Sequence, residues 1–125
     1  MTYYLGISAY HAGSSACIFE DGKIICAIEE ERINRIKNWA GFPILSISRC
    51  INEAKINISD IDYITINSNP VSNIRVKLQK FLFSNNKIKL AKNYFQRFYN
   101  KNYIKDTLEK KFKIKIKAKI IKVDH

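Results

Sequence analysis

Three short apolar runs follow one another at the start of this sequence, separated only by turn-forming residues. The dipeptide between the second and third runs is Asp21-Gly22. Asp-Gly suits the two-residue type I′ turn of a β-hairpin, because both central positions of that turn need positive φ. Connections this short leave no room for a crossover helix. We therefore expect a three-stranded antiparallel meander, with strands near residues 3–9, 15–20 and 23–29.

The loop after the first run is built from small and polar residues around His11. Glycine lets backbone N–H groups approach a phosphate closely, and serine hydroxyls add further donors. The candidate phosphate-binding residues are Ser8, Gly13, Ser14 and Ser15. A purely structural meander needs the same kind of turn, so both interpretations stay open at this point.

A helix and a further strand are expected after the meander. Pro43 is a favourable first helical residue, and apolar residues then recur on one face of a helix from about residue 43 to 56. Residues 61–67 alternate apolar and polar side chains between turn signals, which predicts a strand. The order strand, helix, strand implies a right-handed crossover, which places this strand parallel to the first.

The C-terminal half is harder to interpret. Residues 73–83 and 87–111 favour helices, and we interpret residues 70–111 as a basic helical insertion. Residues 112–122 alternate strictly between apolar side chains and lysines. That pattern predicts a half-buried strand that enters the same sheet and buries its isoleucines.

The length and composition fit a single subdomain over residues 1–125. With 46% apolar residues the chain can bury an ordinary core. No apolar run approaches the roughly 18 residues of a membrane span, and the N-terminus lacks the features of a secretory signal. We therefore expect a cytoplasmic protein with no membrane partner.

The cysteines Cys17, Cys26 and Cys50 lie within apolar runs, which favours buried thiols over a disulfide framework or a metal site.

The net charge of +11 is concentrated in the second half of the chain. Residues 70–125 contain 16 Lys and Arg against 3 Asp and Glu, and aromatic residues are interleaved between Lys92 and Tyr103. This pattern is typical of nucleic-acid surfaces, and also of amphipathic helices whose lysines face water. Because lysine is enriched along the entire chain, we favour the solvated helix. We expect weak, salt-sensitive association but no specific nucleic-acid binding.

A charged segment, EEERINRIK, follows the third expected strand at residues 29–37. Its carboxylates and the cations Arg32, Arg35 and Lys37 are close enough in sequence to converge on one site. The alternative is a solvated turn with local ion pairs, each of which contributes little to stability.

The first half of the chain carries a specific series of motifs: LGISAYH, SSA, DGKI and EEERINRIKNWAGFP. Residues 4–67 resemble the start of the O-carbamoyltransferase family, which includes nodulation-factor and antibiotic carbamoyltransferases. The terminal KVDH is similar to the approach to that family's His-His-x-x-His segment. The resemblance implies an incomplete actin-like ATPase, or ribonuclease H-like, subdomain. This is an α/β fold whose mixed sheet begins with a three-stranded antiparallel meander and a crossover helix.

The resemblance also implies a two-step reaction in the full-length protein. A C-terminal domain uses carbamoyl phosphate and ATP to make carbamoyl adenylate, and the actin-like domain transfers the carbamoyl group to a small-molecule hydroxyl acceptor. We therefore expect this chain to be a carbamoyltransferase fragment, inactive without the missing C-terminal domains or a partner chain that supplies them. The alternatives are another actin-like protein, such as a sugar kinase or threonylcarbamoyl-transfer protein, and a small basic nucleic-acid-binding module.

Three catalytic residues follow from the resemblance. His11 matches the family's first-loop histidine, near the reacting carbamoyl group, and Arg32 and Lys37 match its cations. Histidine suits general base catalysis near neutral pH, and a cation can hold phosphate or stabilise an oxyanion. A loop histidine that only bonds the backbone is the alternative for His11. The chain departs from many relatives at Ala12, where they have an acidic residue, and at Asn38, where they have histidine.

His125 matches the first histidine of the family's metal-binding His-x-x-x-His pair. Paired imidazoles with a carboxylate suit Fe²⁺, Zn²⁺ or a similar ion. The resemblance thus implies a divalent metal, together with ATP or carbamoyl adenylate, in the full-length protein. The second histidine lies outside this sequence, and one imidazole holds a metal poorly. An unoccupied terminal histidine is the alternative, and we expect no cofactor to bind tightly to this chain.

Overall fold

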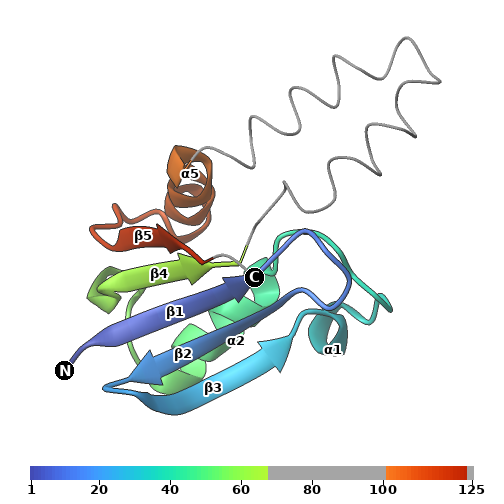
Figure 1. Ribbon diagram of the computed structural model, residues 1–125, viewed down its shortest axis with the longest axis horizontal. Helices are drawn as coiled ribbons and strands as arrows, with labels where there is room; N and C mark the ends of the chain where they lie inside the picture. Colours follow the sequence, from blue (N-terminus) through green and yellow to red (C-terminus); the bar gives the residue numbers. More distant parts are fainter. Residues whose placement is uncertain (68–100, 124–125) are drawn as a thin grey trace, which may run out of the picture.

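A five-stranded mixed sheet with helices packed on one face forms the described part of the computed structural model (Figure 1). The structure describes residues 1–67 and 101–123. The strands are β1 (Tyr3–Ser8), β2 (Ser15–Glu20), β3 (Lys23–Glu29), β4 (Tyr63–Ile66) and β5 (Lys119–Lys122). The helices are α1 (Glu31–Asn34), α2 (Ile44–Ala54), the 3₁₀ turn η1 (Ile58–Asp60) and α5 (Lys101–Phe112).

The N-terminal meander is confirmed. β1 pairs antiparallel with β2, and β2 pairs antiparallel with β3. Glu20 lies opposite Lys23, so the second connection has only the two residues Asp21 and Gly22. Both have positive φ, 46° and 83°, as a type I′ turn requires.

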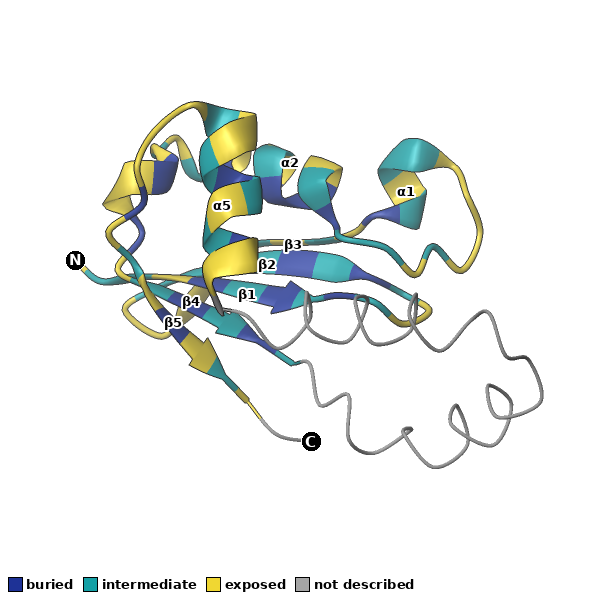
Figure 2. Cartoon of the chain, turned by 90° about the horizontal axis from the view of Figure 1, so that it is seen from above, coloured by how far each residue is buried: buried dark blue, intermediate teal, exposed yellow. Residues whose placement is uncertain are grey.

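The crossover is also confirmed. α2 leads from the meander to β4, which pairs parallel with β1, and β5 pairs parallel with β4. The order in the sheet is therefore β3-β2-β1-β4-β5. Figure 2 shows α2 and α5 on the same face of the sheet. The core between these layers includes Leu5, Ile18, Ile47, Ile64, Ile104 and Leu108.

The opposite face of the sheet carries the alternate residues of each strand. Tyr4 and Tyr63 are register partners there, and their rings stack with centroids 5.1 Å apart. Leu5 and Ile64, each one residue further along, are fully buried on the helix-covered face. The period-two alternation thus separates a core face from a face that the described helices leave uncovered.

The expected strand over residues 112–122 is wrong in its extent. Only Lys119–Lys122 forms a strand. Phe112 is instead the last residue of α5, where it continues the four-residue apolar spacing of Ile104 and Leu108. The left-handed backbone of Lys113, with φ 55°, then stops the helix. The strand that does form joins the same sheet, as expected.

The isoleucines of this segment follow the corrected structure. Ile116 is buried in the connection between α5 and β5, where its backbone N–H donates to Glu109 Oε1 at 2.8 Å. Ile120 is also buried, but Ile114 is 43% exposed. The expectation that the isoleucines here are buried is therefore wrong for Ile114 and for Ile121, which is 38% exposed.

The expected insertion at residues 70–111 lies mostly outside the described residues. Its last part is helical, since α5 begins at Lys101. The predicted helix at residues 73–83 is not among the residues that the structure describes. No helix in the described ranges has the length and apolar character that crossing a membrane requires.

Candidate active site

A groove of about 610 Å³ lies on the face of the sheet away from α2. Gly6 and its register partners Cys17 and Thr65 contribute to its lining. A Cβ atom at Gly6 would lie 2.6 Å from Cys17 Sγ, so glycine leaves the space that the thiol occupies. The groove also reaches Ser8 at the end of β1 and Asn67 just after β4. It therefore lies where the carboxyl ends of two parallel neighbouring strands meet.

His11 contacts the groove indirectly, through a hydrogen bond with Ser8. Its Nε2 lies 3.2 Å from Ser8 Oγ, and its Nδ1 lies 3.4 Å from the carbonyl oxygen of Ala12. Asn67 Nδ2 donates to the same Ser8 hydroxyl at 3.3 Å. The imidazole is exposed and does not itself line the groove, whereas Ser8 and Asn67 do.

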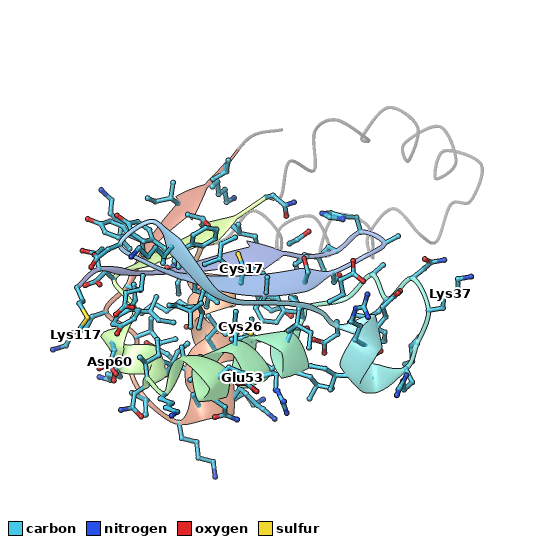
Figure 3. All side chains as sticks on the ribbon, turned by 90° about the horizontal axis from the view of Figure 1, so that it is seen from below. Cys17, Cys26, Lys37, Glu53, Asp60 and Lys117 are labelled. Atoms are coloured by element: carbon cyan, nitrogen blue, oxygen red, sulfur yellow. The ribbon has the colours of Figure 1, made fainter. Side chains whose placement is uncertain are left out.

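The two predicted cations differ in position. Arg32, on α1, lines the groove, and its Nε lies 3.9 Å from Glu29 Oε2. Both side chains of this ion pair are exposed, so the pair contributes little to stability and leaves the guanidinium available. Lys37 is exposed on the loop after α1 and does not line the groove. Figure 3 shows Lys37 at the outer edge of the molecule, pointing away from Cys17.

The predicted phosphate-binding residues also separate into two groups. Ser8 and Ser15 line the groove from facing positions on β1 and β2. Gly13, with φ 83°, shapes the loop between them. Ser14 is buried, and its hydroxyl donates to the carbonyl oxygen of Gly41 at 2.8 Å. Ser14 thereby ties the His11 loop to the loop before α2.

Glu30 is a buried carboxylate that no sequence motif distinguished from its neighbours Glu29 and Glu31. It is 2% exposed, and its two oxygens accept the backbone N–H groups of Leu45 at 3.1 Å and Ser46 at 2.7 Å. These are free donors of the first turn of α2, where a negative charge is stabilising. The backbone N–H of Glu30 donates to the Ser14 carbonyl at 2.9 Å. One residue therefore joins α2 to the loop that carries His11.

Alternation along β3 could have found Glu30. It lies two residues after Ile28, on the same side of the strand, whereas the exposed Glu29 faces the other way. The interpretation of this segment as a wholly solvated turn is therefore wrong for Glu30. The short helix α1 was missed as well.

The described residues do not form a metal site. Within residues 1–67 and 101–123, no group of three or more His, Cys, Asp or Glu side chains could hold an ion. The divalent metal that the resemblance implies for the full-length protein stays a prediction, because its proposed ligand is not among the described residues, and we assign it no step. His125 and Asp124 lie outside the described residues.

Burial controls the chemistry of two thiols. Burial raises the pKa of the Cys17 thiol, and that of the Cys50 thiol is raised for the same main reason and through its contact with Cys26. A raised pKa keeps these groups in the unreactive thiol form at neutral and mildly alkaline pH. The prediction of buried thiols is confirmed for Cys50 alone, because Cys17 and Cys26 are only half-buried.

We therefore expect slow alkylation of Cys17 and Cys50 in the native chain. In a Cys26→Ser variant, iodoacetamide labelling near pH 8 should be much slower than after unfolding in guanidinium chloride, because unfolding restores the ordinary thiol pKa. Raising the pH should accelerate native labelling steadily, by about tenfold per pH unit, and this rise should continue past pH 9, where labelling of an ordinary thiol levels off. Equal labelling rates in native and unfolded chains would contradict this expectation.

Comparison with known sequences identifies a family. The carbamoyltransferase N-terminus family matches residues 3–125. An uncharacterised protein of Synechocystis is 40% identical over 82 residues, which are 66% of this chain and 13% of that protein. The nodulation protein NolNO of Sinorhizobium fredii is 46% identical over 54 residues, which are 43% of this chain and 8% of NolNO. The chain thus spans only a small part of the length of these relatives.

Solved structures agree on the fold. YeaZ from Pseudomonas aeruginosa superposes with a TM-score of 0.50 at 11% identity, covering 99% of this chain and 43% of YeaZ. A second structure, described as similar to peptidase YeaZ, gives a TM-score of 0.51 at 12% identity and covers 99% of this chain and 44% of its own. At such identity the likeness shows the fold alone, which is of the actin-like ATPase type.

Proposed function

This chain belongs to the carbamoyltransferase N-terminus family, and from that premise we propose that its groove helps a full-length protein transfer a carbamoyl group to a hydroxyl acceptor. The observation that carries the proposal is the placement of His11, bonded through Ser8 to a groove that Arg32 also lines. Such a transfer needs a proton acceptor for the hydroxyl, which His11 can provide, and a positive charge near the developing anion, which Arg32 can provide.

The donor in this proposal is carbamoyl adenylate, made from carbamoyl phosphate and ATP by another part of the full-length protein. The acceptor oxygen bonds to the carbamoyl carbon, the bond from that carbon to the phosphate oxygen breaks, and AMP leaves with the electron pair. His11 takes up the proton of the acceptor hydroxyl. In this proposal Arg32 and the Ser15 hydroxyl, which both line the groove, hold the phosphate.

In this proposal further domains, in the same chain or in a partner chain, make the carbamoyl adenylate, and the present chain contributes to the transfer step. The described groove offers hydroxyls, one amide, one thiol, the Arg32 guanidinium and the Glu29 carboxylate, and its lining residues do not enclose a space for an adenine base. The role of Lys37 and the cytoplasmic location stay predictions.

Replacing His11 with alanine should reduce carbamoyl transfer by roughly a hundredfold, the scale of general acid–base catalysis. The assay joins this chain to the downstream domains of a close relative and measures transfer to an acceptor alcohol. Formation of carbamoyl adenylate by the other domain should persist. Loss of both steps together would indicate a folding role, and no loss in either step would remove His11 from the mechanism.

Arginine variants provide a matched comparison in the same assay. Arg32→Gln removes the guanidinium at the groove and should weaken transfer. Arg49→Gln removes a similar exposed cation from α2, where it pairs with Glu53 at 2.9 Å. Because α2 packs on the other face of the sheet, this change should leave transfer intact (Figure 2). Equal losses from both variants would show that overall charge, and not the groove, controls the reaction.

A further inference from the structure

Ser8 lies between the groove and His11. It is the last residue of β1 and lines the groove, and Asn67 reaches its hydroxyl from the end of the parallel neighbour β4. The backbone N–H of Asn67 donates to the Ile7 carbonyl at 3.2 Å, so the end of β4 is fixed beside Ser8. His11 approaches the same hydroxyl from the loop. A ligand in the groove would therefore contact Ser8, which lines the groove, and not the imidazole of His11, which does not.

The chemistry of the partners sets the direction of these hydrogen bonds. Asn67 Nδ2 can only donate, so it uses one lone pair of Ser8 Oγ, and the hydroxyl hydrogen is free to point to His11 Nε2 when that nitrogen carries no hydrogen. On the other side of the ring, the Ala12 carbonyl can only accept, so the nitrogen facing it, Nδ1, carries the hydrogen. The Ala12 contact therefore favours the neutral tautomer protonated at Nδ1, and in that tautomer Ser8 donates to Nε2.

We propose that Ser8 is the proton relay through which His11 acts on the acceptor hydroxyl. The second lone pair of Ser8 Oγ accepts the hydrogen bond of an alcohol in the groove. As the alcohol oxygen bonds to the carbamoyl carbon, its proton passes to Ser8 Oγ while the Ser8 proton passes to His11 Nε2. The serine is regenerated, and the imidazolium returns its proton to solvent. This inference rests on the proposed function for its catalytic meaning.

The tautomer is tested on the chain itself, without any activity. In a His125→Gln background, which leaves His11 as the single histidine, NMR of the isotope-labelled ring nitrogens should find the neutral imidazole protonated at Nδ1. Ser8→Ala should shift the neutral ring toward the Nε2-protonated form. Ser15→Ala, which removes a hydroxyl facing Ser8 across the two strands, should not change the tautomer. A wild-type ring protonated at Nε2, or a tautomer indifferent to Ser8, would overturn the relay.

Activity then separates the relay from the role of His11. In the joined transferase, Ser8→Ala should cost about as much transfer as His11→Ala, roughly a hundredfold, and the double variant should lose little more, because the two groups act as one unit. Ser8→Thr keeps the hydroxyl and should restore much of the rate. A silent Ser8→Ala beside a damaging His11→Ala would refute the relay and leave the proposed function intact. A silent His11→Ala would refute the proposed function itself.

Discussion

Replacing Ile116 with lysine should destabilise the chain by about 3 kcal/mol or more, the scale for placing an unpaired charge in a core. Ile116 is 2% exposed and belongs to the same core as Ile104, Leu108 and Ile120. Its side chain packs where α5 turns into β5, and its backbone N–H is held by Glu109. A lysine here must either bury its ammonium group or detach this connection. Urea unfolding measures the loss in the free energy of unfolding, provided that the dependence of this free energy on urea concentration has the same slope in both proteins.

Ile114→Lys is the matched control, because it makes the same substitution two residues earlier in the same connection. Ile114 is 43% exposed, so the new ammonium group remains in water. Its effect should stay within about 0.5 kcal/mol, as for ordinary surface changes. Equal losses from the two variants would mean that residues 113–118 form a regular strand or that neither side chain belongs to the core.

Local patterns predicted most of the fold because most of its elements have a short-range signal, although the short helix α1 was missed. Asp21-Gly22 predicts the hairpin between β2 and β3, and the helical spacing of apolar residues after Pro43 predicts an amphipathic helix packed against the sheet. Phe112 shows where such signals fail. It lies four residues after Leu108 and two before Ile114, so it fits the helical and the strand period equally well. Packing of α5 decided between them, and packing is not a local property.

The site was harder to predict because its contacts join distant segments. Ser8 and Asn67 are separated by 59 positions in the sequence, and the parallel pairing of β1 with β4 brings them together. The expected strand order already placed both strand ends at one edge, so Asn67 could have been proposed as a site residue. No such signal separates Lys37 from Arg32. Their positions depend on the left-handed backbone of Arg35, with φ 62°, which ends α1 and turns the chain away.

Glu30 connects the stability of the fold to the geometry of the site. Its carboxylate occupies the N-terminus of α2, where the preceding Pro43 supplies no side-chain cap. Its backbone holds Ser14, and the Ser14 hydroxyl approaches the carbonyl oxygens of both His11 and Gly41. A weakened Glu30 should therefore disturb the His11 loop as well as α2.

Glu30→Gln should cost about 3 kcal/mol, because one buried N–H group loses its acceptor and the helix loses a compensating charge at its N-terminus. The amide oxygen can accept from Leu45 or from Ser46, and the amide NH₂ then faces the remaining donor.

Glu29→Gln is the matched control. Its exposed carboxylate makes only the 3.9 Å contact with Arg32, so its loss should change stability by about 0.5 kcal/mol or less. Hydrogen exchange of the Leu45 and Ser46 amides should accelerate in Glu30→Gln and not in Glu29→Gln. Unchanged protection in both variants would show that the first turn of α2 does not depend on this carboxylate.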